Sequence, residues 1–389
     1  MGEVTGTRRV HGCELLEYRY GPALVPAPAG PVSSMWRYRS LLPLDDSPVR
    51  YPLPVGGTPL VAPPRLRARL GVPELWLKDE TRGPSASNKD RATALVVEDG
   101  LRRGVSTVTT ASTGNAAVAT ALGAAAAGLR AVILVPVDCD PEKVSLMRSA
   151  GALVVRVARG YDAAFDLSRN AAATFGWLDR NTGANPLTTE AKKTVAWEIW
   201  EQLGRRCPDV VVAPVGDGPT LAALAKGFDE LVLCGAVRRL PRVVGVQAEA
   251  CQPLVHRWAG TAPSPQTTDP AGTVADGIAV DRPVAGDLAL DAVRRSGGAM
   301  VAVPDAALLD AVRLLAASAG VGSEPAGAAA LAGLIAALEQ ELLDRSETVA
   351  VLVTGRELRA GPAAAGPDAP VIDGDLDELA ECLAVASRA

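Results

Sequence analysis

The chain has 389 residues, of which 48% are hydrophobic and 21% charged, and its formal net charge is -5. This length and composition predict a globular protein of two or three packed units and exclude a disordered chain. The acidic balance gives no reason to expect nucleic acid or a membrane surface as a partner. The cysteines form no CxxC pair and no secretory signal is recognisable, so we expect a reduced, cytoplasmic protein.

Residues 1–50 contain many prolines and are expected to wrap the surface irregularly. From about residue 75, short apolar runs alternate with alanine- and leucine-rich stretches typical of helices. Continuous apolar strands between helices predict an α/β fold with parallel sheets covered on both faces. Residues 360–389 are expected to be a linker and a tail. The expected strands are 106–112, 131–136, 152–157, 210–216, 243–249, 300–304 and 349–355.

The first motif with chemical content is KDETRGPSASNKDRAT, residues 78–93, in which Lys89 follows a loop of small polar residues. A helix-forming stretch comes next, and the free N–H groups of its first turn would lie beside the lysine. An isolated lysine is usually a solvated surface residue. The motifs that follow favour a chemical role here.

The second motif is TTASTGNAAVA, residues 109–119, where a β-rich run ends at Ser112 and Thr113 and a helical stretch begins near Asn115. A strand that runs into the start of a helix forms a cradle for a carboxylate or a phosphate. An ordinary helix cap would have the same pattern. This motif therefore indicates an anion site only in combination with the others.

Two further motifs also end apolar strands. In VVVAPVGDGPTLAAL, residues 210–224, Gly216 and Gly218 would let the backbone approach a phosphate closely. The segment is neither a Walker A loop nor a GxGxxG fingerprint. In VAVLVTGRELR, Thr354 ends the strand where a ring bound at the edge of the sheet would lie.

In this order, the motifs resemble the threonine synthase-like branch of fold-type II pyridoxal-phosphate enzymes, which share the tryptophan synthase β architecture. The resemblance extends from about Trp36 to Arg359. It implies a large cofactor-binding domain from 1–93 and 188–389 and an inserted, mobile small domain from 94–187. The matching blocks are WRYRSLLPL, GGTPLV, LWLKDE, NKDRA, STGNAA, PVGDG, EPAGAAALAGL and LVTG.

The resemblance implies pyridoxal 5'-phosphate as the cofactor and a Schiff base on Lys89, whose amine would also act as the general base. It implies that Asn115 bonds the pyridoxal hydroxyl and that Thr354 faces the pyridine nitrogen. The substrate carboxylate or phosphate would lie at Ser112, Thr113 and Asn115, and Thr188 would lie nearby. The cofactor phosphate would be held by Gly216, Asp217, Gly218, Pro219 and Thr220.

The function implied is β- or γ-elimination or replacement on a small amino acid, of the threonine synthase type. A dehydratase-type lyase, or a β-replacement synthase that makes a specialised amino acid, is the alternative. A non-catalytic protein that binds the cofactor is a third hypothesis, and the retention of Lys89, Asn115 and Thr354 argues against it. A homodimer is the assembly to consider.

The chain also departs from the family pattern. Asn88 stands where the family usually has phenylalanine, and Ala116 where it has threonine. In NPLTTEAKKT, Thr188 replaces a phosphate-binding arginine and Lys192 replaces a glutamine. Lys192 or Lys193 could substitute for the arginine by pointing inward, but the simpler interpretation places both on a solvated helix face. The family's amino-terminal metal knuckle keeps one cysteine, Cys13, near His11, so we expect no metal.

Thr188 generates a prediction about substrate choice. An arginine binds phosphate through two charge-assisted hydrogen bonds that threonine cannot make. The loss of such a contact costs roughly 2–4 kcal/mol, or about 30- to 1,000-fold in kcat/KM. We therefore expect O-phosphohomoserine to be a poor substrate. A steady-state kcat/KM above ~10⁴ M⁻¹s⁻¹ for threonine formation would contradict this expectation.

Overall fold

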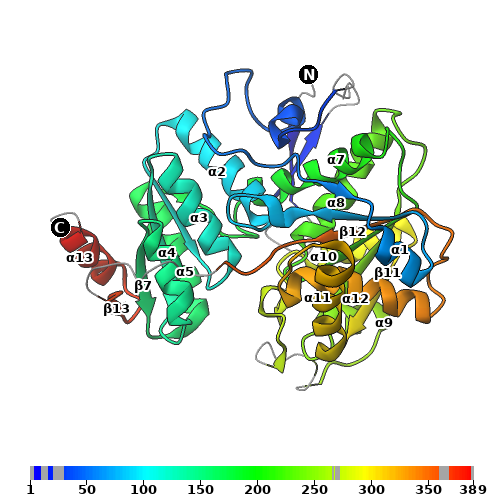
Figure 1. The fold of residues 1–389 in the computed structure, drawn as a ribbon. Coiled ribbons are helices and arrows are strands. Elements are labelled where there is room, and N and C mark those ends of the chain that lie inside the picture. Colours follow the sequence, from blue (N-terminus) through cyan, green and yellow to red (C-terminus); the bar gives the residue numbers. More distant parts are fainter. Residues whose placement is uncertain are drawn as a thin grey trace.

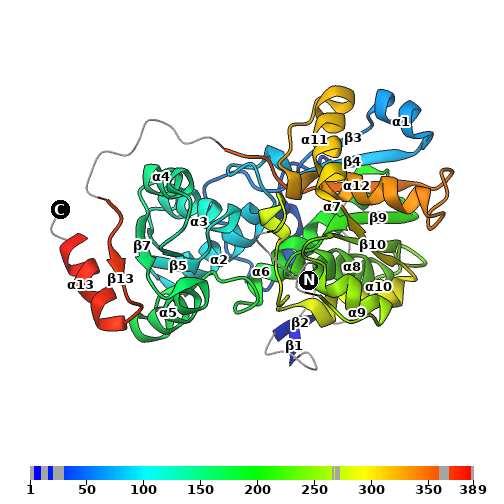
Figure 2. The same ribbon diagram turned by 90° about the horizontal axis from the view of Figure 1, so that it is seen from below.

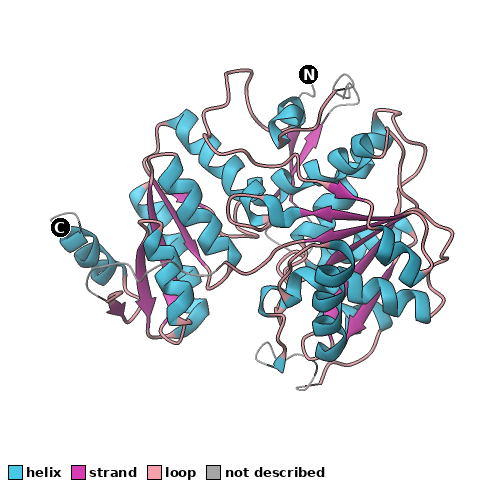
Figure 3. Ribbon diagram, viewed as in Figure 1, coloured by secondary structure: helices cyan, strands magenta, loops and turns pink. Residues whose placement is uncertain are grey.

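The computed structural model describes residues 4–9, 16–20, 30–264, 267, 272–358 and 368–386. Two separate sheets of mainly parallel strands lie side by side, and helices cover the faces of each (Figures 1 and 3). This arrangement confirms the predicted α/β class. Within the described ranges, every helix is too short or too polar to span a membrane. The homodimer and the cytoplasmic location stay predictions.

The larger sheet has six strands in the order β11-β10-β9-β12-β4-β3. All neighbours are parallel except β3 and β4, which are antiparallel. The central strands consist almost entirely of buried valine, leucine and alanine, as expected for a sheet covered on both faces. The strands are β3 (Leu60–Val61), β4 (Leu75–Asp79), β9 (Val210–Pro214), β10 (Arg242–Ala248), β11 (Ala299–Val303) and β12 (Val349–Val353).

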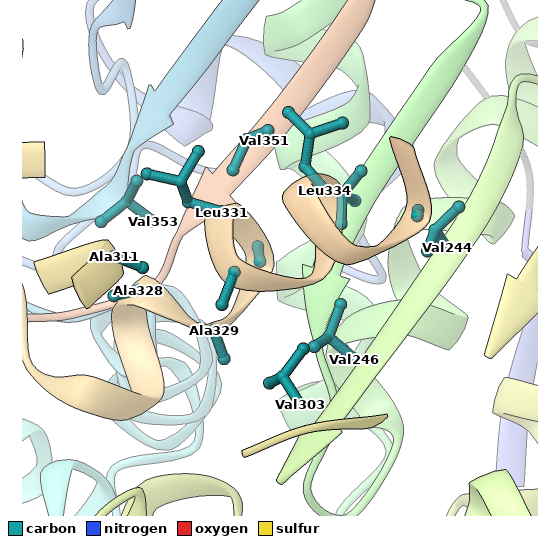
Figure 4. Packing of buried hydrophobic residues seen from close by; sticks show 14 of the residues in the cluster. Val244, Val246, Val303, Ala311, Ala328, Ala329, Leu331, Leu334, Val351 and Val353 are labelled. Carbon is teal, nitrogen blue, oxygen red and sulfur yellow. The ribbon is translucent and has the colours of Figure 1, made fainter. Parts of the chain in front are cut away.

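Side chains that alternate along each strand of this sheet contribute to two different cores. Val210 and Val212 pack with helices α1 (Pro64–Leu70), α11 (Asp305–Ala319) and α12 (Pro325–Glu339). Val211 and Ala213 pack on the opposite face with helices α7 (Thr194–Gln202), α8 (Pro219–Leu233), α9 (Pro253–Ala259) and α10 (Gly286–Ser296). The buried helix α12 lies across the first face (Figure 4).

Helix α12 can approach the sheet closely because of its small residues. A Cβ atom at Gly333 would lie 2.2 Å from the Val246 side chain, and one at Gly327 would lie 2.2 Å from the carbonyl oxygen of Gly355. Any side chain at these positions would push the helix away. The contact at Gly355 brings the start of α12 to the carboxyl end of β12.

The smaller sheet has five strands in the order β13-β7-β6-β5-β8. One face packs against α2 (Lys89–Arg103), α3 (Asn115–Ala126) and α4 (Pro141–Ser149), and the other against α5 (Gly160–Phe175) and α13 (Leu376–Ala386). The seven strands expected from apolar runs coincide with strands of the two sheets. The strands of the smaller sheet are β5 (Thr107–Ala111), β6 (Arg130–Pro136), β7 (Leu153–Val157), β8 (Leu178–Asp179) and β13 (Val371–Ile372).

Both ends of the chain differ from expectation. The amino-terminal residues include an antiparallel pair of strands, β1 (Val4–Arg9) and β2 (Leu16–Tyr20), where we expected irregular structure. The tail, which we assigned to the large domain, instead adds β13 to the edge of the smaller sheet, beyond β7 (Figure 2). Most of the expected linker, residues 359–367, lies outside the described residues.

Backbone hydrogen bonds and one buried side chain explain the position of the tail. The Arg156 N–H donates to the Pro370 carbonyl, and the Ala158 N–H donates to the Ile372 carbonyl, each over 2.8 Å. Leu379 of α13 is fully buried against the core beside α5. A two-residue strand has no alternating pattern, which is why its sequence does not predict it.

A buried network of charged side chains joins strand β4 of the larger sheet to helices α2 and α7. Glu198 of α7 accepts hydrogen bonds from Lys78 of β4 and from Arg91 of α2, each over 2.6 Å. Arg91 also donates through two nitrogens to Glu80, each over 2.7 Å. All four side chains are almost completely buried. The first turn of α2 is therefore fixed to β4 and α7 by paired, desolvated charges.

Replacing Glu198 tests this network. Burial alone would raise the pKa of Glu198, but Arg91 and Lys78 outweigh burial and lower that pKa to about 2. Glu198→Gln leaves two buried cations with less compensation, so we expect a loss of about 3–5 kcal/mol in the free energy of unfolding, measured with urea. In the original protein, the ionised Glu198 contributes this stability at any pH above about 4.5, and the contribution disappears as the pH falls towards about 2. The difference between the two proteins should therefore shrink over the same pH range.

A matched control removes a carboxylate from an exposed ion pair. Asp310 and Arg313 pair on the surface of α11. Asp310→Asn is expected to change the unfolding free energy by less than about 1 kcal/mol. Equal effects of the two substitutions would show that the buried network does not hold the helix.

Candidate active site

Lys89 occupies the first position of α2, beside the carboxyl end of β12. The Asn88 N–H donates to the Thr354 carbonyl over 2.8 Å, and Ser87 forms a β-bridge with Gly355. These backbone contacts fix the loop that carries the lysine to the end of a central strand. Thr354 itself is largely buried, at the position from which we expect it to face a bound ring.

Several charged groups surround the amine of Lys89. Burial lowers the pKa of Lys89, the negative charge of Glu324 opposes this, and the positive charge of Arg180 lowers it further. Asp217 and Asp276 add smaller opposing effects. An amine with a lowered pKa is more often uncharged at neutral pH, which is the form that attacks a carbonyl carbon or takes a proton.

Asn115 reaches this point from the smaller sheet. It begins α3, and its Nδ2 donates to Oε1 of Glu324 over 2.7 Å. A Cβ atom built at Gly355 would lie 3.0 Å from Glu324 Oε1 and 3.3 Å from Asn115 Nδ2. Before Asn115, the Ser112 hydroxyl accepts the Gly114 N–H over 3.2 Å, which shapes the turn between β5 and α3. Ser112 and Thr113 are both half-buried.

The turn from Gly216 to Thr220 connects β9 to α8. Gly218 has a φ of +95°, and a Cβ atom there would lie 2.6 Å from the carbonyl oxygen of Ala285, so only glycine fits. The Ala285 N–H donates to the Asp217 carbonyl over 2.8 Å. Pro219 has no N–H to contribute and begins α8, whose following N–H groups have no partners within the helix.

Thr188 is fully buried, and its Oγ1 donates to the Asn185 carbonyl over 2.7 Å. The single proton of this hydroxyl is therefore already used within the chain. A contact between Thr188 and a substrate stays a prediction.

Arg180, which the sequence did not single out, is a fully buried cation next to Lys89. Its guanidinium donates to the Lys89 carbonyl over 3.3 Å and to the hydroxyls of Thr93 and Thr182 over 3.1 Å each. Burial lowers the pKa of Arg180 to about 10. The only signal for it in the sequence is its position immediately after strand β8, at a carboxyl end of the smaller sheet.

Tyr161, at the start of α5, was also missed. Its hydroxyl donates to the Ala111 carbonyl over 3.4 Å, close to the turn that holds Ser112. Desolvation and the charge of Asp217 raise the pKa of Tyr161 to about 12. The hydrogen bond places the Tyr161 hydroxyl beside the carboxyl end of β5, where the turn with Ser112 begins.

The interpretation of Lys192 and Lys193 as a solvated helix face is wrong. Both lie in the short helix η3 (Ala191–Lys193) and are buried. Lys193 forms ion pairs with Glu190 and Glu230, the latter over 2.7 Å. Lys192 instead interacts electrostatically with Lys89, Arg180 and Asp217. The chain turns through three short helical segments here, so sequence periodicity could not predict which side chains face inward.

The arrangement has no metal-type ligand set. Throughout the ranges that the structure covers, three or more histidine, cysteine, aspartate or glutamate side chains nowhere converge. His11 and Cys13 lie outside those ranges, so the absence of zinc stays a prediction.

The residues present fit a cofactor that bears an aldehyde and a phosphate. Lys89 provides an amine with a lowered pKa. The turn after β9 leaves room that any side chain at Gly218 would fill, and it ends at the start of α8, where free N–H groups can bind a phosphate. These features define the site of a pyridoxal-phosphate enzyme of fold type II. The chain belongs to the family described as pyridoxal-phosphate dependent enzyme, whose family model matches residues 51–355.

Known proteins agree with this assignment. The threonine synthase of Methanosarcina acetivorans is 35% identical over 357 residues, which cover 90% of this chain and 86% of that protein. The threonine synthase of Mycobacterium leprae is 34% identical over 340 residues, covering 86% of this chain and 90% of that protein. The predicted family, cofactor and enzymatic nature are thereby confirmed.

Solved structures show the same fold. Maize serine racemase has a TM-score of 0.65 at 20% identity and covers 85% of this chain and 92% of its own. The L-serine ammonia-lyase of the fungus Rhizomucor miehei has a TM-score of 0.63 at 25% identity and covers 77% of this chain and 93% of its own. Similar folds therefore occur in proteins named for different reactions on small amino acids.

Gly218→Val tests the glycine turn. A valine side chain would collide with the Ala285 backbone and fill the cradle, so we expect the affinity for pyridoxal phosphate to fall by about 10- to 100-fold. Titration of the cofactor-free protein, followed by absorbance, measures the change. Gly235→Val is the control: Gly235 also has a positive φ, at the other end of α8, but nothing lies within 4 Å of its Cβ position. Equal losses in both variants would exclude the turn as the phosphate site.

Proposed function

We propose that this enzyme catalyses β- or γ-elimination or replacement on a small amino acid, in the manner of threonine synthase, with the cofactor held as a Schiff base on Lys89. One observation carries the proposal. The Asn88 N–H bonds the Thr354 carbonyl next to Lys89, and Asn115 bonds Glu324 close to Gly355. A Cβ atom at Gly277 would lie 3.6 Å from Glu324 Oε1, and one at Gly216 would lie 3.5 Å from the Gly277 carbonyl oxygen. These contacts support a site in which the amine, the phosphate cradle and the substrate turn meet at the carboxyl ends of the two sheets.

The bound cofactor would supply an electron-accepting ring that makes the substrate's α-proton acidic. Lys89 would hold the cofactor and, once displaced, take the α-proton, because its lowered pKa favours the free amine. The turn of Ser112, Thr113 and Asn115 would orient the substrate carboxylate at the start of α3. Thr354 would offer the ring nitrogen an uncharged hydroxyl, which leaves that nitrogen unprotonated.

A dehydratase-type lyase or a β-replacement synthase is the second candidate. It is favoured by Thr188, a buried, uncharged residue whose hydroxyl proton is donated to the Asn185 carbonyl, in the place of the family's phosphate-binding arginine. The fold similarity to a serine ammonia-lyase at 25% identity is compatible with this candidate. The two candidates share Lys89 and differ in the group that leaves and in the product.

Chemical labelling tests Lys89 directly. We expect the purified enzyme to absorb near ~410–430 nm and borohydride to fix the cofactor to the peptide that contains Lys89. Lys192 is the instructive alternative, because it is the other lysine that interacts electrostatically with Lys89. Label on the Lys192 peptide would overturn the assignment, and Lys89→Ala should remove the label altogether.

Product analysis then separates the reactions. The enzyme is incubated with serine, threonine, O-phosphohomoserine, O-acetylhomoserine and O-acetylserine, and the products are identified by mass spectrometry. Threonine from a homoserine ester indicates γ-replacement, and a 2-oxo acid with ammonia indicates elimination. A labelled enzyme that turns over none of the panel would contradict both candidates.

A further inference from the structure

Lys192 is a buried lysine whose amine has no hydrogen-bond or ion-pair partner in the described part of the chain. Only 2% of its surface is exposed. Among the residues that the structure describes, no hydrogen bond or ion pair engages its ammonium, whereas the neighbouring Lys193 has two carboxylate partners. The short helix η3, which carries Lys192, packs against α2, which begins at Lys89, and against α8, which begins directly after Gly218. The amine therefore belongs to the segment between the lysine of the site and the glycine turn.

The groups around this amine disfavour its charged form as long as no anion is bound. Burial lowers the pKa of Lys192 well below its ordinary value, the positive charges of Lys89 and Arg180 lower it further, and Asp217 alone opposes them. Lysine is rarely buried unless it is paired, because burying an unpaired ammonium costs several kcal/mol. A side chain in this environment is stabilised when an anion enters beside it.

Asp217 is a buried carboxylate that needs a positive charge nearby. Its carboxylate lies in the turn that would hold a phosphate, and burial raises its pKa while Lys192, the largest opposing influence, lowers it. A phosphate dianion bound at this turn would be repelled by an ionised Asp217 unless a cation lay close to both. Arg180 is already held by three hydrogen bonds, and Lys89 is committed to the cofactor aldehyde under the proposed function. Lys192 is the cation that remains.

We propose that Lys192 is the counter-ion of a phosphate ester bound at the Gly216–Thr220 turn, and that it compensates the carboxylate of Asp217 there. This inference rests on the proposed function, since it places the cofactor beside Lys89. The phosphate ester is that of the cofactor or that of a phosphorylated substrate. Both have the same chemistry, and the geometry of the turn favours the cofactor.

The test compares cofactors with and without the phosphate. Full-length protein is stripped of cofactor and titrated with pyridoxal phosphate and with pyridoxal. Lys192→Gln, which installs the residue found in the resembling family block, should weaken pyridoxal phosphate binding by about 10- to 100-fold and pyridoxal binding by less than about threefold. Lys192→Arg should recover part of the difference, and Arg313→Gln, which removes a cation from the exposed pair with Asp310 on α11, should leave both affinities unchanged.

Asp217→Asn provides an independent readout. In the Lys192→Gln background it should restore the affinity for pyridoxal phosphate to within about threefold of the original protein, because the uncompensated carboxylate is gone. A residue with a merely structural role would weaken both ligands equally, and Asp217→Asn would not restore the difference between them.

Substrate kinetics distinguish the source of the phosphate. If Lys192→Gln leaves pyridoxal phosphate binding intact but raises KM for O-phosphohomoserine about tenfold and not for O-acetylhomoserine, the substrate supplies the phosphate that Lys192 binds. Equal weakening of pyridoxal phosphate and pyridoxal, or no effect on either cofactor or substrate selectivity, would overturn the inference. Borohydride labelling at Lys89 in the same variant keeps the proposed function separate, because its failure there would challenge Lys89 and not Lys192.

Discussion

The carboxylate of Glu198 holds together the segments that carry both lysines of the site. It joins Lys78 of β4 to Arg91, which lies in the same first turn of α2 as Lys89. Glu198 itself belongs to α7, the helix that directly follows the short helix with Lys192. A fully desolvated carboxylate with two cationic partners has strict geometric requirements. The buried contacts of Glu198 therefore determine how Lys89 and Lys192 lie relative to each other, although Glu198 is not itself part of the proposed site.

The two sheets contribute unlike parts to the site. The larger sheet provides the end of β12 and the glycine turn after β9, whereas the smaller sheet provides the start of α3 and Arg180. Three polar contacts lie between these parts: Asn115 with Glu324, Arg180 with the Lys89 carbonyl, and Lys143 with Asp276. Polar contacts of this kind can exchange partners with little cost when a ligand enters, whereas a packed apolar contact cannot.

The sequence predicts those parts of the structure that depend on local pattern. Apolar runs located the strands, and polar residues after them located the turns around Ser112, Gly216 and Thr354, because ligands of α/β proteins bind where parallel strands end. Lys192, Arg180 and Glu324 could not be assigned in this way. Each of these residues is desolvated and interacts with neighbours that are distant in the sequence. Lys192 also lies in a charged stretch that is typical of the surface of a helix. The placement of β13 likewise depends on a free edge elsewhere in the chain.

That edge has a consequence for the solubility of the chain. Strand β7 would end the smaller sheet if β13 were missing, and its outward N–H and C=O groups near Arg156 would then have no partners. An uncovered edge of apolar, β-branched residues pairs readily with strands of other molecules. Every residue of the proposed site precedes Gly355, so the tail contributes nothing to the chemistry that the structure suggests. By occupying the edge of β7, the tail keeps the smaller sheet from becoming a template for aggregation.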